Sequence, residues 1–393
     1  MAEWREVALG DVLTLQRGFD ITKKTQRPGL VPVISSAGIS SHHDESRAEG
    51  PGVVIGRKGS LGTTFFVDGP YWPHDTTLWV RDFKGNAPYF CYLLLKTLLL
   101  AGLDVGSSNP TLNRNHVHLL PVRVPPIGTQ KRIAATLAAF DELIDINERR
   151  IELLEGLAQS VYREWFVRFR FPGHDDVALV DSDLGRIPSG WTPVRVAELA
   201  NLSRRSVTPA RVPGATFEHF SIPAFDGGRL PSRECGLSIL SGKYAVDGEC
   251  VLVSKLNPRI ARVWFAMPES DSAITTTEFL PLKGVRVSNA WLWTTLSGDA
   301  FRSSLTSAAG GTSTSHQRVK PDDVIGHEVV LADIQTRERF DAIAEPSLRE
   351  VGYLLRHNGA LAATRDLLLP RLVTGRLEIS DIELGALLPA EAA

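Results

Sequence analysis

The sequence predicts a mixed α+β fold. Two similar globular domains are separated by two long helices, which pair antiparallel within the chain as a coiled coil with pseudo-two-fold symmetry. Three observations predict this fold. The chain repeats its own pattern, each repeat ends in a long run of heptad-spaced apolar residues, and a stretch rich in helix breakers joins the repeats. At 393 residues, the chain is long enough for two or three domains.

The repeat is clearest where each half begins. Trp4, Val7 and Leu9 recur with the same spacing as Trp191, Val194 and Val196. Further on, GVVIGRK at 52–58 has a looser counterpart in GECVLVSK at 248–255. Short strands are expected at 53–55, 63–67, 77–80, 251–253 and 261–265, and apolar helices at 88–102 and 289–304. The chain therefore consists of two related globular regions, each followed by a helix.

The first long helix is expected from Gln130 to Phe166, where apolar residues recur every three or four positions. Its seam is Ile133, Leu137, Phe140, Ile144, Asn147, Ile151, Leu154, Ala158, Val161 and Trp165. The second seam is Phe340, Ala344, Ser347, Val351, Leu354, Asn358, Leu361, Arg365, Leu368 and Leu372. We expect Pro346 to start or kink the second helix and Pro370 to end it. Gly352 and Gly359 each weaken it by about 1 kcal/mol relative to Ala.

The two seam asparagines favour an antiparallel pairing. In a parallel alignment each amide faces an apolar residue, at a cost of about 1–3 kcal/mol. In the antiparallel alignment Asn147 faces Asn358 and Ile151 faces Leu354, so the amides can fix the register of the coiled coil. Phe140 then faces Arg365, whose stem we expect to lie on the ring while its head reaches water. The two globular regions are expected at opposite ends of this rod.

Composition narrows the class of protein. The net charge of −2 excludes a uniformly basic nucleic-acid coat, so any DNA contact depends on local patches. Three widely spaced cysteines (Cys91, Cys235 and Cys250) favour a reducing cytoplasm over a disulfide framework. The sequence shows no secretory signal pattern and no apolar stretch long enough to span a bilayer. We therefore expect a cytoplasmic globular protein.

Three segments together resemble the specificity subunits of type I restriction–modification systems. PPIGTQKRIA at 125–134 resembles the entry to their central conserved helix, and IDINERRIELLEGLAQSVYREWFVRFRFPG at 144–173 resembles that helix itself. TRDLLLPRLVTG at 364–375 resembles the end of the second conserved helix. The second helix has no counterpart of Trp165 and Phe166, and its entry lacks the Pro-Pro pair.

The resemblance implies a division of the chain and a role for each part. Target recognition domains would occupy 1–125 and 172–333, conserved helices 126–171 and 334–375, and a tail 376–393. Each recognition domain would read one half of a bipartite, asymmetric target in double-stranded DNA, and the helices would set the spacer. Two modification subunits would dock on the helices and methylate adenine with S-adenosylmethionine. Restriction subunits would use ATP and Mg²⁺, while this chain would carry no catalytic residue and no cofactor.

A search for catalytic motifs agrees with a non-catalytic subunit. Asn109-Pro110-Thr111 and Asn257-Pro258-Arg259 do not fit the Asn-Pro-Pro-aromatic loop of adenine methyltransferases. The stretch 56–60 lacks the spacing of a phosphate-binding loop. His42, His43 and Asp44 have no further ligand nearby in sequence, so we expect a solvated loop and no metal.

Candidate DNA-contacting residues lie in stretches that combine Lys, Arg, Asn, Gln, Ser or Thr with few acids. The first half offers Lys23, Lys24, Arg27, Arg57, Lys58, Ser107, Ser108, Asn109, Asn113, Arg114, Asn115 and His116. The second half offers Arg204, Arg205, Arg211, Lys255, Asn257, Arg259, Arg262, Thr312, Ser313, Ser315, His316, Gln317 and Arg318. The stretches 105–124 and 300–320 take equivalent places before a long helix.

Alternative functions remain open on the sequence alone. A stand-alone DNA-binding regulator could use the same two domains, and a coiled-coil scaffold could bind only proteins. A catalytic methyltransferase or nuclease is disfavoured by the missing motifs. Neither the recognised bases nor the spacer length follows from the sequence, because readout depends on docking geometry and DNA shape.

Overall fold

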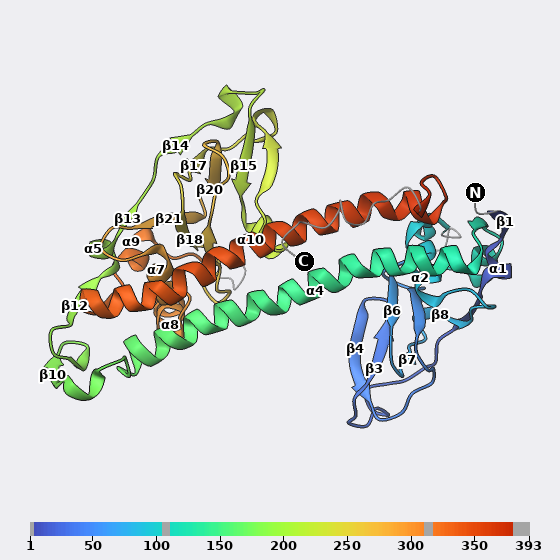
Figure 1. The fold of residues 1–393 in the computed structure, drawn as a ribbon, viewed down its shortest axis with the longest axis horizontal. Helices are drawn as coiled ribbons and strands as arrows, with labels where there is room; N and C mark the ends of the chain where they lie inside the picture. The colour runs from blue at the N-terminus through green and yellow to red at the C-terminus, as the bar shows by residue number, and fades with distance from the viewer. Residues whose placement is uncertain (1–3, 104–110, 310–316, 380–393) are drawn as a thin grey trace. The chain divides into compact units, whose positions relative to one another are not determined.

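The computed structural model describes residues 4–103, 111–309 and 317–379. They form two compact units, Met1–Leu143 with Leu361–Ala393, and Ile144–Ala360 (Figure 1). Each unit contains a globular α+β region and one part of the helix pair α4 (Ile127–Tyr162) and α10 (Ile334–Val373). The predicted fold class is confirmed. Within the described residues, no helix is both long and apolar enough to cross a membrane.

The first globular region contains three small sheets. The central sheet has the order β2 (Thr14–Arg17), β8 (Thr77–Asp82), β5 (Gly52–Gly56), β6 (Thr64–Val67). Beside it lie the sheet β4 (Gly38–His43), β3 (Val31–Ser35), β7 (Trp72–Pro73) and the pair β1 (Arg5–Ala8), β9 (Pro121–Val124). The helices are α1 (Leu9–Val12), α2 (Pro88–Thr97), the 3₁₀ turn η1 (Leu100–Leu103) and α3 (Arg114–His118).

The second globular region repeats this plan with additions. Its central sheet has the order β13 (Ala200–Leu202), β21 (Phe279–Gly284), β18 (Cys250–Ser254), β19 (Val263–Ala266). A five-stranded sheet follows, β14 (Ser206–Val207), β17 (Lys243–Ala245), β20 (Ala273–Thr276), β15 (Thr216–Phe220), β16 (Ser232–Cys235). The pairs are β12 (Thr192–Arg195) with β22 (Glu328–Leu331) and β10 (Leu179–Ser182) with β11 (Gly185–Pro188). The helices are α5 (Val196–Leu199), α6 (Ile222–Asp226), α7 (Asn289–Leu296), α8 (Asp299–Ala308) and α9 (Pro321–Ile325), with 3₁₀ turns at His174–Asp176, Pro209–Arg211 and Gly236–Ser238.

The two central sheets have equivalent strand orders, which agrees with the internal repeat. In both, an apolar strand with every residue buried, β5 or β18, lies between two antiparallel neighbours. Such continuous burial is typical of a strand covered on both faces. The apolar stretch expected as one helix at 289–304 is instead two helices. Its break lies at Ser297 and Gly298, where Gly298 takes an extended conformation as the N-cap of α8.

The second long helix runs through both prolines, so it neither starts at Pro346 nor ends at Pro370. It continues without a break from Ile334 to Val373. Phe340, Ala344 and Leu348 on either side of Pro346 are almost fully buried in one apolar cluster. Packing of this face outweighs the cost of about 3 kcal/mol for an internal proline. The first helix begins at Ile127 and continues past Tyr162 as the π-helical turn η2 (Arg163–Val167).

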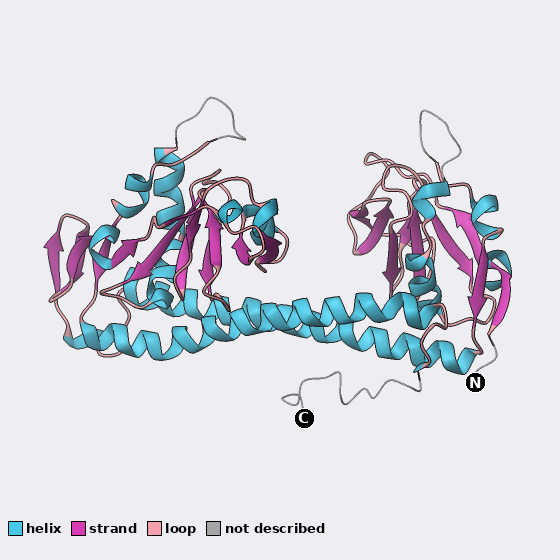
Figure 2. Cartoon of the chain, turned by 90° about the horizontal axis from the view of Figure 1, so that it is seen from above, coloured by secondary structure: helices cyan, strands magenta, loops and turns pink. Residues whose placement is uncertain are grey.

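Within the second unit, α4 and α10 run antiparallel side by side; both are cyan in Figure 2. Asn147 Nδ2 donates to Asn358 Oδ1 at 2.8 Å, and Asn358 Nδ2 donates to the Ile144 carbonyl at 3.4 Å. Ile151 packs with Leu354 and Val351 in one buried cluster. These are the pairs that the antiparallel alignment of the two seams places opposite each other.

Within the first unit, Arg365 behaves differently from the prediction. Its guanidinium does not reach into water but pairs with Asp141 on α4 and with its own neighbour Asp366. Tyr89 on α2 donates to the second oxygen of Asp141 at 2.5 Å. Burial and this carboxylate raise the pKa of Tyr89. A charged acceptor on α4 outcompetes water for the arginine because its hydrogen bonds are charge-assisted. This Tyr89–Asp141–Arg365 network joins three helices.

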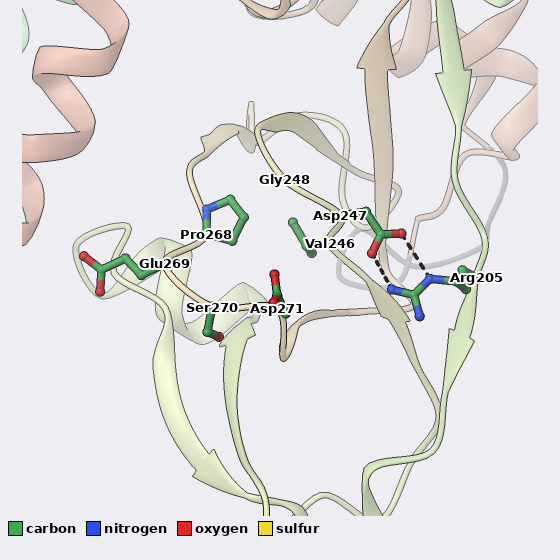
Figure 3. Close-up of a pocket in the computed structure, with 8 residues that line it drawn as sticks. All are labelled: Arg205, Val246, Asp247, Gly248, Pro268, Glu269, Ser270 and Asp271. Carbon is green, nitrogen blue, oxygen red and sulfur yellow. Dashed lines mark hydrogen bonds and ion pairs between the residues drawn. The ribbon is translucent and has the colours of Figure 1, made fainter.

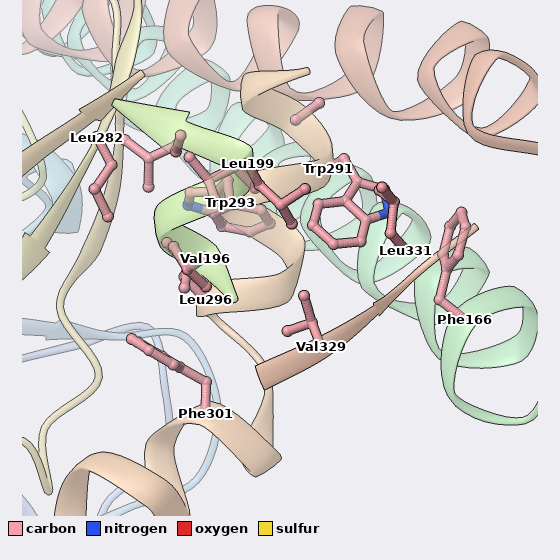
Figure 4. Close-up of a cluster of buried hydrophobic side chains, with 14 of the residues drawn as sticks. Phe166, Val196, Leu199, Leu282, Trp291, Trp293, Leu296, Phe301, Val329 and Leu331 are labelled. Carbon is pink, nitrogen blue, oxygen red and sulfur yellow. The ribbon is translucent and has the colours of Figure 1, made fainter. Parts of the chain in front are cut away.

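An aromatic cluster holds the second globular region against its helices. Figure 4 shows Trp291, Leu331 and Phe166 gathered beside the end of α4. Phe166 lies 5.2 Å from Phe340 and 6.1 Å from Trp291, between ring centroids, in edge-on contacts. Such pairs add about 0.5–1.5 kcal/mol each beyond the area they bury.

Candidate nucleic-acid interface

A tight turn follows the central strand of the first region. After β5 come Arg57, Lys58 and Gly59, and Gly59 has φ +77°, a left-handed conformation that glycine adopts at little cost. The N–H groups of Arg57 and Lys58 donate to the Thr76 carbonyl at 2.8 and 3.1 Å. This turn projects Lys58 into solvent from a rigid sheet.

The same turn is joined to the segment that precedes α3. Lys58 forms an isolated antiparallel bridge with Thr111, and Leu112 N donates to the Arg57 carbonyl at 3.0 Å. Two groups of predicted DNA-contacting residues, Arg57 with Lys58 and the described part of the stretch 105–124, therefore meet in space. We call this arrangement, residues 57–59 with 111–116, the first joint.

The second region has an equivalent joint, residues 255–259 with 317–319. Asn257, which takes the place of Gly59, has φ +52°, a conformation that asparagine tolerates better than most residues. Its N–H donates to the Gln317 carbonyl at 2.8 Å, and Val319 N donates to the Lys255 carbonyl at 3.1 Å. Leu256 bridges Arg318 in antiparallel fashion, as Lys58 bridges Thr111. The duplication therefore extends from the sheets to the loop contacts.

The two joints differ in available positive charge. At the first joint Lys58 and Arg114 are exposed, and no ion pair involves either of them in the described part of the chain. At the second joint Arg259 is exposed in the same way, but Arg318 donates to both oxygens of Glu278 at 3.1 and 3.2 Å. Arg262 likewise makes two bonds to Asp226, at 2.7 and 2.9 Å. Phosphate binding at the second joint would have to compete with these carboxylates.

Polar atoms without partners lie at both joints. Arg57 Nη1 and Gln317 Oε1 are buried and make no hydrogen bond within the described residues. Leaving such an atom unpaired costs about 1–3 kcal/mol. Asn113 has a different role, because its side chain accepts from Asn115 N at 3.0 Å and caps α3. Asn115 and His116 are exposed on the first turn of that helix.

The basic residues near Lys23 lie apart from the first joint in the fold. Lys23 and Lys24 are exposed in a turn between β2 and β3. Arg27 donates to Asp44 at 2.7 Å and to Glu45 at 2.5 Å, and its hydrogen bond holds the pKa of Asp44 below the usual range. Arg27 is therefore neutralised, and Lys23 and Lys24 carry the unpaired charge of this stretch.

Among the arginines at 204–211, Arg205 lines a hollow that also contains three acids. Arg205 pairs with both oxygens of Asp247, which lies in a hollow of about 380 Å³ with Glu269 and Asp271 (Figure 3). These acids would repel a phosphate. Arg204 and Arg211 are exposed, and neither belongs to this ion pair. Of the predicted DNA-contacting stretches, this one has the least favourable local charge.

Some features of the site could not be found from the sequence. Thr76 and Glu278 position the two turns through their backbone carbonyls, and a carbonyl acceptor leaves no signal in residue type. The candidates Ser107, Ser108, Asn109, Thr312, Ser313, Ser315 and His316 lie outside the described residues.

The prediction of a solvated loop at 42–44 is wrong for His43. It ends strand β4, is 3% exposed, and takes the Arg27 N–H on Nδ1 at 3.0 Å. Its ring also packs edge-on against Trp72, 5.2 Å between centroids. Elsewhere in the described part of the chain, no three His, Cys, Asp or Glu side chains are grouped as metal ligands.

Comparison with known proteins identifies relatives of one kind. A family profile described as "Type I restriction modification DNA specificity domain" matches residues 1–156. The type I restriction enzyme MjaIX specificity subunit of Methanocaldococcus jannaschii is 22% identical over 76% of this chain and 71% of its own length. The HindI specificity subunit of Haemophilus influenzae is 23% identical over 43% of this chain and 42% of its own length. In fold, the crystal structure of a type I S subunit from M. genitalium aligns with a TM-score of 0.67 at 13% identity, covering 94% of this chain and 96% of that one.

Proposed function

We propose that this chain is a specificity subunit of a type I restriction–modification system and therefore the DNA-reading subunit of such a complex. Residues 1–125 and 172–333 would each read one half of a bipartite target. Residues 126–171 and 334–375 would set the spacer, and the tail 376–393 would lie beyond them. The stand-alone regulator is not carried forward, since each relative reported above is named as a specificity subunit.

The duplicated joint is the observation that carries this proposal. Each joint places a turn with a left-handed residue at the end of the most buried strand and ties it to the chain just before α3 or α9. A rigid sheet with polar, basic loops at its edge is suited to positioning side chains against phosphates and bases. Two such joints in one chain would read two half-sites.

The long helices offer a surface for partner subunits. Ile146, Leu153 and Leu157 on α4 are 43%, 73% and 46% exposed, and their spacing places them along one side of the helix. Exposed apolar side chains in a row are typical of protein interfaces. We propose that modification subunits dock here and supply S-adenosylmethionine for adenine methylation, while restriction subunits supply ATP and Mg²⁺. This chain would contribute no cofactor and no catalytic residue, and would act on DNA in the cytoplasm of a bacterial or archaeal cell.

A methylation map tests the proposal. The chain is expressed with its cognate modification subunit in a host free of DNA methylation, and N6-methyladenine is located by long-read sequencing. We expect one gapped, asymmetric motif with one methylated adenine on each strand. Exchange of residues 1–125 for those of a relative should change one half of the motif. A complex that forms on DNA but leaves every adenine unmethylated would contradict the proposal.

A further inference from the structure

A row of polar side chains crosses one face of the five-stranded sheet in the second region. His219 on β15 lies opposite Ser232 on β16, and Lys243 on β17 lies opposite Thr276 on β20. Glu234, two residues after Ser232, points to the same face because side chains alternate along a strand. All five line one hollow of about 600 Å³.

Lys243 is a buried cation with no counterion in contact. The residue is 7% exposed, and its ammonium donates to Ser241 Oγ at 2.6 Å and to the Ser241 carbonyl at 3.3 Å. Within the described residues it makes no ion pair, and burial lowers its pKa. A lysine has three N–H donors, so one remains for a group in the hollow.

His219 has a ring nitrogen without a hydrogen-bond partner. Its Nδ1 lies 2.9 Å from Glu234 Oε1, which also accepts from Ser232 Oγ at 2.6 Å. The carboxylate therefore fixes the proton on Nδ1, and Nε2 carries a lone pair in the neutral ring. Burial lowers the pKa of His219 and favours this neutral form. The residue is 8% exposed, and Nε2 is buried with no partner in the described part of the chain.

The opposite wall of the hollow is apolar. Ile222, Pro223 and Ala224 of α6 and Leu230 after it line that side. Apolar lining together with a few fixed donors and acceptors is the usual composition of a small-molecule pocket. A phosphate fits poorly, because the Glu234 carboxylate belongs to the same row and repels anions.

We propose that this hollow, the base pocket, binds a nucleobase. A ring nitrogen or carbonyl of the base would accept from Lys243, an edge of the base would lie next to His219, and the ring would lie against Ile222 and Pro223. The pocket goes beyond the proposed function, since reading base edges in a groove needs no such cavity. The base would come either from a nucleotide outside the duplex stack or from a free nucleoside.

Nucleoside binding to the full-length chain tests this proposal. Adenosine, guanosine, cytidine and thymidine are titrated separately and followed by saturation-transfer NMR. We expect at least one to bind, and Lys243→Met to weaken it at least tenfold while Tm stays equal or rises, because an unpaired buried charge is removed. The matched control is Arg233→Gln. Arg233 lies on the same strand as Ser232 and Glu234, is 73% exposed, and points to the other face, so affinity should not change.

Two results would overturn the base pocket. One is that no nucleoside binds, or that Lys243→Met binds as the parent chain does. The other is displacement of the nucleoside by inorganic phosphate at equal concentration. Competition by single-stranded but not duplex oligonucleotides would identify an unstacked nucleotide as the source of the base, and no competition by either would identify a free nucleoside. The assay uses neither the recognised DNA site nor partner subunits, so its failure is distinct from failure of the proposed function.

Discussion

The two globular regions share a central sheet order but are fixed to the long helices by different chemistry. In the first, Tyr89, Asp141 and Arg365 form a chain of directed hydrogen bonds across α2, α4 and α10. In the second, the rings of Phe166, Trp291 and Phe340 bury each other. The same topology is thus stabilised once by charge-assisted bonds and once by apolar area, so the two attachments should respond differently to substitution.

In the second region, loops also pack closely against α10. A methyl group on Gly352 would lie 2.5 Å from Met267 Sδ, and one on Gly359 would lie 2.6 Å from Leu230 Cδ1. The two glycines that weaken the helix therefore let loops of the second region reach it. Arg356 adds an ion pair with Glu269 at 3.1 Å in the same place. The positions on α4 that the repeat makes equivalent to these glycines, Asp145 and Glu152, are exposed.

The largest effect is expected from breaking the aromatic cluster. Trp291→Ala removes a fully buried ring and should lower the free energy of unfolding by about 3–5 kcal/mol. Chemical denaturation of the full chain measures the change. Leu367→Ala, at a position 55% exposed on α10, is the control and should change stability by less than about 0.5 kcal/mol. Equal losses in the two variants would contradict the role of the cluster.

Breaking the polar network should cost less. Asp141→Asn keeps the size of the side chain but leaves Arg365, 21% exposed, without its charged partner on α4. The free energy of unfolding should fall by about 2 kcal/mol. In a double-mutant cycle with Arg365→Gln, the loss should be smaller in the double variant than the sum of the two single losses. Strict additivity would show that the two residues do not interact.

A pH-dependent contribution is expected from one buried acid in the second region. Asp341 on α10 accepts from Ser288 Oγ at 2.6 Å, and burial raises its pKa to about 6. An acid with a raised pKa in the folded state contributes stability below its unfolded pKa, and this is lost as pH rises through about 4 to 6. Asp341→Asn should therefore raise stability at pH 7 by up to about 2 kcal/mol and flatten this part of the pH profile. Ala134 takes the equivalent place in the first region, so no counterpart is expected there. A profile unchanged in the variant would refute the assignment.

The smallest expected effect is the difference in stability between Gly→Ala substitutions at two helix positions. Gly156 on α4 has open space around its Cα, so Gly156→Ala should stabilise the chain by about 1 kcal/mol. Gly352→Ala gains the same helix propensity but must displace the Met267 side chain, and its net effect should be close to zero. Thermal unfolding of the two variants gives the comparison. An equal rise in Tm would show that Gly352 makes no close contact.

The sequence predicted those features that depend on periodic or repeated patterns. The heptad seams placed Asn147 opposite Asn358, and the repeat indicated that strands 52–56 and 250–254 are counterparts. The failures have one physical cause, which is that long-range packing overrides local signals. Pro346 stays inside a helix because Phe340 and Ala344 are buried beside it, and Arg365 turns from water to Asp141.

The candidate site was predictable only in part. Residue type indicated the stretches around Lys58 and Arg259, but not that backbone bridges join them to the segments before α3 and α9. Residue type also could not show that Arg318 forms an ion pair with Glu278 and Arg262 with Asp226. Ion pairs between residues distant in sequence are decided by the fold.

The methylation pattern of joint variants tests the central claim most directly. Lys58→Gln with Arg114→Gln alters the first joint, and Arg259→Gln alters the second, each in the complex with the modification subunit. If each joint reads one half-site, each variant should relax or lose the bases of a different half of the methylated motif, while the Arg233→Gln control keeps the parental motif. The account would be contradicted if both variants methylated the parental motif, with both halves unchanged, and only the extent of methylation fell equally at all sites.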